Sequence, residues 1–74
     1  MEKFKYLVEA RILEDVKYDM NRAFGFGNHC PVGTMMHNSM PYVIILAFGT
    51  YDAELRFRNI CDELFNEAMV LRLD

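Results

Sequence analysis

The chain has 74 residues, of which 53% are hydrophobic and 26% are charged, and its formal net charge is −3. This length allows one domain over residues 1–74, and the composition excludes a disordered tail or a low-complexity linker. The 8 basic residues are scattered among 11 acids, so we expect no duplex nucleic acid as a partner. A domain this small buries only ~60% of the surface that its unfolded chain exposes, so a partner or self-association would stabilise it.

Residues 25–50 contain no Lys, Arg, Asp or Glu. The longest apolar run among them, residues 42–48, is too short to cross a membrane, because a spanning helix needs ~20 such residues. Glu2 and Glu9 interrupt the region where a signal peptide would have its apolar core. We therefore expect no membrane partner and a cytoplasmic location.

The first predicted element is a strand over residues 4–12. Apolar residues fill its even positions and charged residues fill three of its four odd positions: Phe4, Tyr6, Val8, Ala10 and Ile12 against Lys5, Glu9 and Arg11. This alternation is typical of a strand with one buried face. A competing pattern, with apolar residues four apart, indicates one continuous helix over residues 3–24. We favour the strand, because a strict spacing of four drifts around a helix of 3.6 residues per turn.

A helix is predicted next, over residues 14–24, with acids in its first turn and glycines that end it at 25 and 27. Residues 25–33 are expected to form a loop, because Pro31 cannot lie inside a helix. A short strand over residues 34–37 and a turn over residues 38–41 follow.

The apolar run over residues 42–48 predicts a central strand that is covered on both faces. Thr50 is the expected N-cap of a second helix over residues 51–68. One stripe of this helix is apolar and is expected to be buried: Ala53, Phe57, Ile60, Cys61, Leu64, Phe65 and Ala68. The tail over residues 69–73 alternates again and is expected to be an edge strand.

The predicted order β-α-β-β-α-β is that of the ferredoxin-like fold, a two-layer α/β (α+β) sandwich. In that plan the first and third strands are central, and these are the two richest in apolar residues here. The alternative is a small all-α bundle with helices over residues 3–24 and 51–71.

Residues capable of chemistry are few. Cys30 and Cys61 are interpreted as reduced thiols, with Cys61 buried. His29 and Cys30 are adjacent, which makes chelation of one metal ion by both awkward, and no third group is available to orient a Cys–His pair. We therefore expect no metal, no cofactor and no enzymatic activity. A minimal enzyme that uses Cys30 with His29 or His37 is kept as an alternative.

The uncharged segment is the strongest candidate for a binding site, because its apolar residues fall in an expected loop, edge strand and turn. The expected partner-binding residues are Phe26, Val32, Met35, Met36 and Met40. An edge strand without charges also invites pairing with another strand. A second candidate surface is the open sheet face formed by Lys5, Leu7, Glu9 and Arg11.

The sequence thus predicts a small non-catalytic protein-binding domain, acting as a regulator or inhibitor by occupying a site on a larger protein, and self-associating as a homodimer. Small stand-alone regulators of this kind are common in phages and other mobile elements, an origin that we keep open. The alternative is a small-molecule-sensing dimer, with its ligand held at the dimer interface near the glycine loop.

Overall fold

The structure of the protein is a computed structural model, and it describes residues 1–66 and 68–73. These residues form β1 (Glu2–Glu9), the 3-10 turn η1 (Ala10–Ile12), α1 (Leu13–Phe24), β2 (His29–His37), β3 (Met40–Gly49), α2 (Tyr51–Leu64) and β4 (Val70–Leu73). The order of strands and helices is the predicted one, and the mixed α and β content confirms the α+β class. The continuous helix over residues 3–24 and the all-α bundle are wrong, because the period-two segment is the strand β1.

The four described strands form one antiparallel sheet in the order β2-β3-β1-β4. The central positions of β1 and β3, and the edge positions of β2 and β4, agree with the sequence-based expectation. In the register of the sheet, Leu7 on β1 lies opposite Ile44 on β3 and Leu71 on β4. The β2–β3 hairpin turns at Asn38 and Ser39, whose φ angles of 51° and 63° are typical of a type I′ turn.

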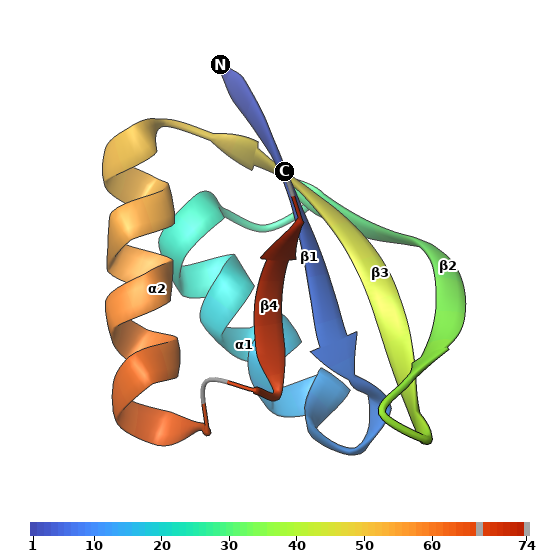
Figure 1. Cartoon of the computed structure of the whole chain (residues 1–74). Helices are drawn as coiled ribbons and strands as arrows, with labels where there is room; N and C mark the ends of the chain where they lie inside the picture. The colour runs from blue at the N-terminus through green and yellow to red at the C-terminus, as the bar shows by residue number, and fades with distance from the viewer. Residues whose placement is uncertain (67, 74) are drawn as a thin grey trace.

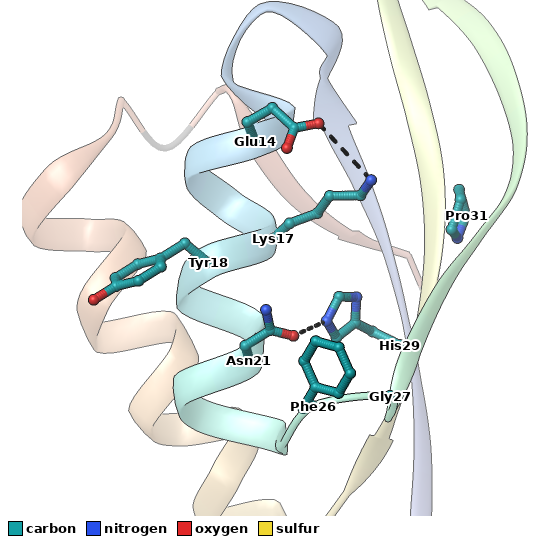
Figure 2. Close-up of a pocket in the computed structure, with 8 residues that line it drawn as sticks. All are labelled: Glu14, Lys17, Tyr18, Asn21, Phe26, Gly27, His29 and Pro31. Atoms are coloured by element: carbon teal, nitrogen blue, oxygen red, sulfur yellow. Dashed lines mark hydrogen bonds and ion pairs between the residues drawn. The ribbon is translucent and has the colours of Figure 1, made fainter.

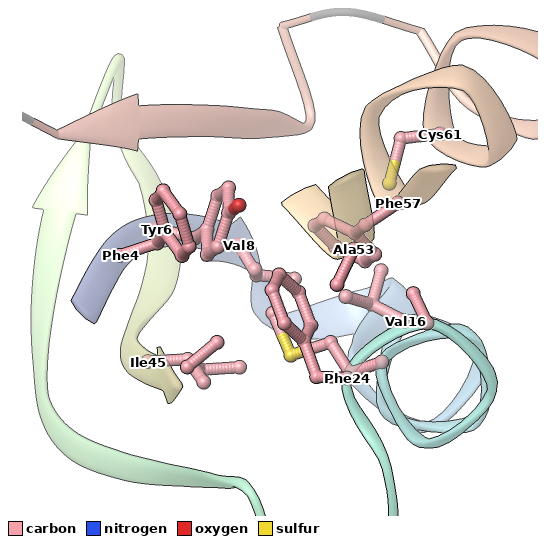
Figure 3. Close-up of a cluster of buried hydrophobic side chains, with 12 residues drawn as sticks. Phe4, Tyr6, Val8, Val16, Phe24, Ile45, Ala53, Phe57 and Cys61 are labelled. Carbon is pink, nitrogen blue, oxygen red and sulfur yellow. The ribbon is translucent and has the colours of Figure 1, made fainter. Parts of the chain in front are cut away.

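α1 and α2 cover one face of the sheet, as Figure 1 shows. The apolar core lies between this face and the two helices (Figure 3), and it consists of Phe4, Tyr6, Val8, Val16, Met20, Ala23, Phe24, Ile45, Ala47, Ala53, Phe57 and Cys61. Tyr6 and Phe57 meet edge to face, with ring centroids 5.0 Å apart. Gly49 leaves room for Phe24, because a Cβ at this glycine would lie only 2.8 Å from the ring. The even positions of β1 are apolar because they supply one side of this core.

A buried polar link joins β1, α2 and β4. The Tyr6 hydroxyl donates a hydrogen bond to the Glu54 carboxylate, and Arg72 Nη1 lies 3.5 Å from Glu54 Oε1. Burial, together with the hydrogen bond to Glu54, raises the pKa of Tyr6 well above its usual range. The phenol therefore keeps its proton and remains a donor, which satisfies the carboxylate inside the domain.

The strands differ most from the prediction at the end of β1 and the start of β2, while β3 begins two residues early, at Met40. β1 ends at Glu9 instead of continuing to Ile12, because the chain turns through η1 to bring α1 onto the sheet. β2 begins at His29, inside the segment expected to be a loop. Pro31 is accommodated there because β2 is an edge strand, where a missing N–H is tolerated, and the register shifts between Pro31 and Gly33.

The second helix begins where predicted but ends early. The Ala53 N–H donates to Thr50 Oγ1 over 3.1 Å, which confirms the N-cap. The helix ends at Leu64 instead of residue 68, because Phe65 is extended and Asn66 Oδ1 accepts the Ala68 N–H over 2.9 Å in the turn toward β4. Leu64 and Ala68 are consequently exposed and do not belong to the buried stripe.

Candidate functional site

The sheet has a second face, which α1 and α2 leave uncovered. Side chains alternate along a strand, so the residues between the core positions of β1 and β3 point to this side. We call it the open face; its side chains are Lys3, Lys5, Leu7, Glu9, Cys30, Met35, His37, Met40, Tyr42, Ile44, Leu46, Phe48, Leu71 and Leu73. The expectation that β3 is covered on both faces is therefore wrong.

The middle of the open face is apolar. Leu7 is only 2% exposed, although neither helix lies over it, because its cross-strand neighbours Ile44 and Leu71 flank it. Leu46 and Phe48 extend the apolar area along β3, and they are half-buried, as are Ile44 and Leu71. The open face thus presents half-buried apolar side chains from β3 and β4 on either side of the buried Leu7, the type of surface that marks an interaction site.

One end of the open face is sealed by polar contacts. The Tyr42 hydroxyl donates to the Ala68 carbonyl over 2.9 Å, and the His37 ring meets the Tyr42 ring edge to face at 5.2 Å. Glu9 is only 4% exposed and forms an ion pair with Arg11. Of the four residues predicted for an open sheet face, Glu9 therefore lies on this face but is buried, whereas Arg11 lies in η1 beyond the strand.

The opposite end of the open face carries Lys3 and Lys5, both exposed. They lie across from Phe48 and Leu46 on β3, so their ammonium groups border the apolar area. Lysine stems lie readily along apolar surface while the charged group stays in water. Lys5 and Leu7 are on the face to which the sequence pattern assigned them, although Leu7 is nearly enclosed by its neighbours.

The outer edge of β2 continues the open face. Within the described residues β2 pairs with β3 alone, so its other edge offers unpaired backbone groups. Met35 and Met36 are 44% and 63% exposed. Strand alternation turns one of these methionines toward the helix side of the sheet, yet both are exposed, so neither packs in the core.

The remaining predicted partner-binding residues are scattered around β2. Val32 is exposed where the register shifts, and Met40 is half-buried at the start of β3. Phe26 is exposed in the segment before β2 and lies beside α1 rather than on the open face (Figure 2). The fold therefore brings Met35 and Met40 onto the open face and places Phe26 at a separate site.

That separate site is a hollow of about 570 Å3 between α1 and the start of β2. Figure 2 shows the residues that line it: Glu14, Lys17, Tyr18, Asn21, Phe26, Gly27, His29 and Pro31. His29 Nε2 lies 2.6 Å from Asn21 Oδ1. Burial, and the positive charge of Lys17, lower the pKa of His29, so its ring is neutral at pH 7.

The candidates for catalysis are held apart or engaged elsewhere. His29 and Cys30 are consecutive on β2, so their side chains point to opposite faces of the sheet. His37 contacts Tyr42, and Cys61 is buried, as predicted, with its pKa raised by desolvation to about 12. Both cysteines are free thiols. Among the described residues, His, Cys, Asp and Glu form no group of three that could hold a metal ion.

Comparison with known proteins finds no relative: no family model, no curated protein and no solved structure matches the chain. In the described part of the chain, no helix is long and apolar enough to cross a membrane.

The residues that sequence reasoning missed lie on β3 and β4: Ile44, Leu46, Phe48, Leu71 and Leu73. Three of them lie in the apolar run over residues 42–48, and a run without polar residues predicts a strand that is covered on both sides. The signal that could have found them is the element order itself. Right-handed crossovers in a β-α-β-β-α-β chain bring both helices to one face, which leaves the other face open.

Proposed function

We propose that the chain is a small, non-catalytic protein-binding domain of ferredoxin-like plan, acting as a regulator or inhibitor by covering a site on a larger protein. The sheet order β2-β3-β1-β4, with α1 and α2 on one face, supports the ferredoxin-like assignment. The observation that carries the function is the open face, where half-buried apolar side chains of β3 and β4 flank Leu7 and where, within the described residues, no helix lies over the sheet.

The area of this surface suits a protein partner. A standard interface buries ~800 Å2 on each side, which is roughly a sixth of the 4690 Å2 that the chain exposes. The domain measures 33 × 25 × 21 Å along its principal axes, so one of its faces can supply an area of this order.

The unpaired edge of β2 adds a second means of contact. A strand from another chain can hydrogen-bond to this edge, and the absence of charge from residues 25–50 removes the usual obstacle to such pairing. We propose that self-association, where it occurs, uses this edge and joins two sheets into one.

The proposal is tested with two matched leucine-to-glutamate variants. Leu46→Glu places a carboxylate on the open face, opposite Lys5 in the sheet, whereas Leu55→Glu places one on the exposed outside of α2. Association is measured by sedimentation velocity and by capture of partners from a lysate of the source cell, with circular dichroism to check the fold. We expect Leu46→Glu to lose its contacts and Leu55→Glu to keep them. If the two variants are folded and associate equally, the open face is not the contact surface and the proposal is wrong.

The hollow between α1 and β2 supports a second candidate function, the small-molecule sensor. It lies beside Gly27, where such a ligand is expected, and Phe26 and Tyr18 give it apolar walls (Figure 2). A thermal-shift screen of metabolites tests this function. A stabilising compound whose effect disappears in Phe26→Ala would support the sensor, and the same shift in both proteins would place the compound elsewhere.

A further inference from the structure

The charged residues are distributed unequally between the two faces of the domain. Among the described residues, the charged groups of the open face are Lys3, Lys5 and Glu9, and the carboxylate of Glu9 is buried and paired with Arg11. The two lysines are exposed. In the described part of the chain, no carboxylate lies within ion-pair distance of either one.

The helix layer carries the opposite charge. Its exposed acids are Glu14, Asp15, Asp52, Asp62 and Glu63. The two helices also carry four bases, Lys17, Arg22, Arg56 and Arg58, so their seven acids and four bases leave a balance of −3, equal to the formal net charge of the whole chain. The open face is therefore apolar with a cationic border, in a molecule that is anionic as a whole.

This distribution discriminates between possible occupants of the open face. Within the described residues, the open face of a second copy brings two more lysines and no accessible carboxylate, because Glu9 lies next to Tyr42 at the sealed end and is already paired. Facing copies would therefore leave the lysines of both chains without partners. Charges at the border of an interface guide association and orientation, so they indicate what the partner carries.

We propose that the open face binds an apolar surface of a different protein that carries carboxylates beside it, placed to meet Lys3 and Lys5. This inference rests on the proposed function and adds the sign of the charge that the partner carries beside its apolar surface. It leaves the edge of β2 as the place where a second copy can pair. The net charge of the chain alone predicts attraction to basic partners, whereas Lys3 and Lys5 predict an acidic one. An experiment can therefore separate the two expectations.

The experiment uses two amphipathic helical peptides with the same leucine stripe, one flanked by glutamates and the other by lysines. A helix has no free strand edge, so it does not pair with β2 and instead reports on a face. Binding of fluorescent peptides to the full chain is measured by anisotropy at low and high salt. We expect the glutamate peptide to bind at least about tenfold more tightly at low salt, with the difference shrinking as salt screens the charges.

A matched pair of charge-reversal variants locates the effect. Lys3→Glu combined with Lys5→Glu is expected to abolish or reverse the preference for the glutamate peptide. Lys17→Glu combined with Arg58→Glu makes the same change in net charge on α1 and α2, and it is expected to leave the preference intact. Circular dichroism confirms that each variant is folded, since all four side chains lie at or near the surface.

Three results would overturn the inference. If the native chain binds the lysine peptide as tightly as the glutamate peptide, or more tightly, the partner does not need carboxylates. The inference would then be wrong, while the proposed function stands. A homodimer that dissociates in Leu46→Glu but persists in Leu55→Glu would make the second copy the occupant of the open face. If neither peptide binds and Leu46→Glu leaves association unchanged, the proposed function fails together with the inference.

Discussion

At the scale of single residues, Asp19 on α1 is a buried carboxylate that is only partly paired. It is 2% exposed, its Oδ1 lies 3.7 Å from Arg22 Nη1, and within the described residues its Oδ2 has no hydrogen-bond partner. Desolvation raises its pKa above the usual value, and Arg22 offsets only part of this effect. An ionised carboxylate here reduces the free energy of unfolding, because burial penalises the charged form.

Asp19→Asn is therefore expected to raise the melting temperature at pH 7. The folded pKa lies above the unfolded one, so the native chain loses stability as the pH rises from the unfolded pKa, ~3.9, through the raised folded value. The asparagine variant does not have this loss. Melting temperatures of the two proteins are measured from pH 3 to pH 8. The advantage of the variant should grow as Asp19 of the native chain loses its proton, and it should stay constant at higher pH. A variant that is less stable than the native chain at pH 7 would show that Asp19 is satisfied when charged.

The two cysteines should respond in opposite ways to serine. Cys61 is buried against the core, so Cys61→Ser places a hydroxyl among apolar groups and should cost ~1–3 kcal/mol in the free energy of unfolding. Cys30 is exposed on β2, so Cys30→Ser should change stability by less than ~0.5 kcal/mol. Urea unfolding measures both values. Large and equal losses would contradict the separate environments of the two thiols.

At the scale of elements, the sequence predicts existence and order better than extent. The alternation from Phe4 to Val8 is sufficient to predict β1, and Thr50 marks the start of α2. A local pattern does not show where a strand must end so that the next helix can reach the core. The alternation therefore extends the predicted strand to Ile12, three residues beyond the end of β1. An apolar run also does not reveal whether one or both faces of the strand are covered. That difference decides whether Leu46 is a core residue or part of the open face. Coverage depends on where distant helices pack.

The edge strand β2 gives a test at this scale. Met35 and Met36 are both exposed, so Met35→Lys and Met36→Lys should each fold, with stability within ~0.5 kcal/mol of the native chain. Either lysine should weaken pairing of another strand with β2, since edge lysines oppose such pairing. Only Met35→Lys should also affect the open face, where a third lysine should increase the preference for the glutamate peptide, because Met35 lies opposite Tyr42 on that face. Sedimentation and the peptide assay separate the two effects, and unfolding of either variant would contradict the register of β2.

At the scale of the whole molecule, one sheet divides two different surfaces. The helix layer encloses the aromatic core and carries most of the negative charge, while the open face is apolar and bordered by Lys3 and Lys5. A 74-residue chain has a modest core, so a partner that covers the open face should add to its stability. At a free partner concentration of 100 times Kd, the gain is about 2.7 kcal/mol, which should appear as a higher melting temperature.

The central claim is that contacts are made through the open face. Methyl cross-saturation by NMR tests it most directly, with the labelled chain bound to an unlabelled partner. Saturation is expected at the methyl groups of Ile44, Leu46 and Leu71, and not at those of Leu55 and Leu64, which are exposed on or beside the helix layer. Transfer confined to Leu55 and Leu64, with none to the methyl groups of the sheet, would contradict the account.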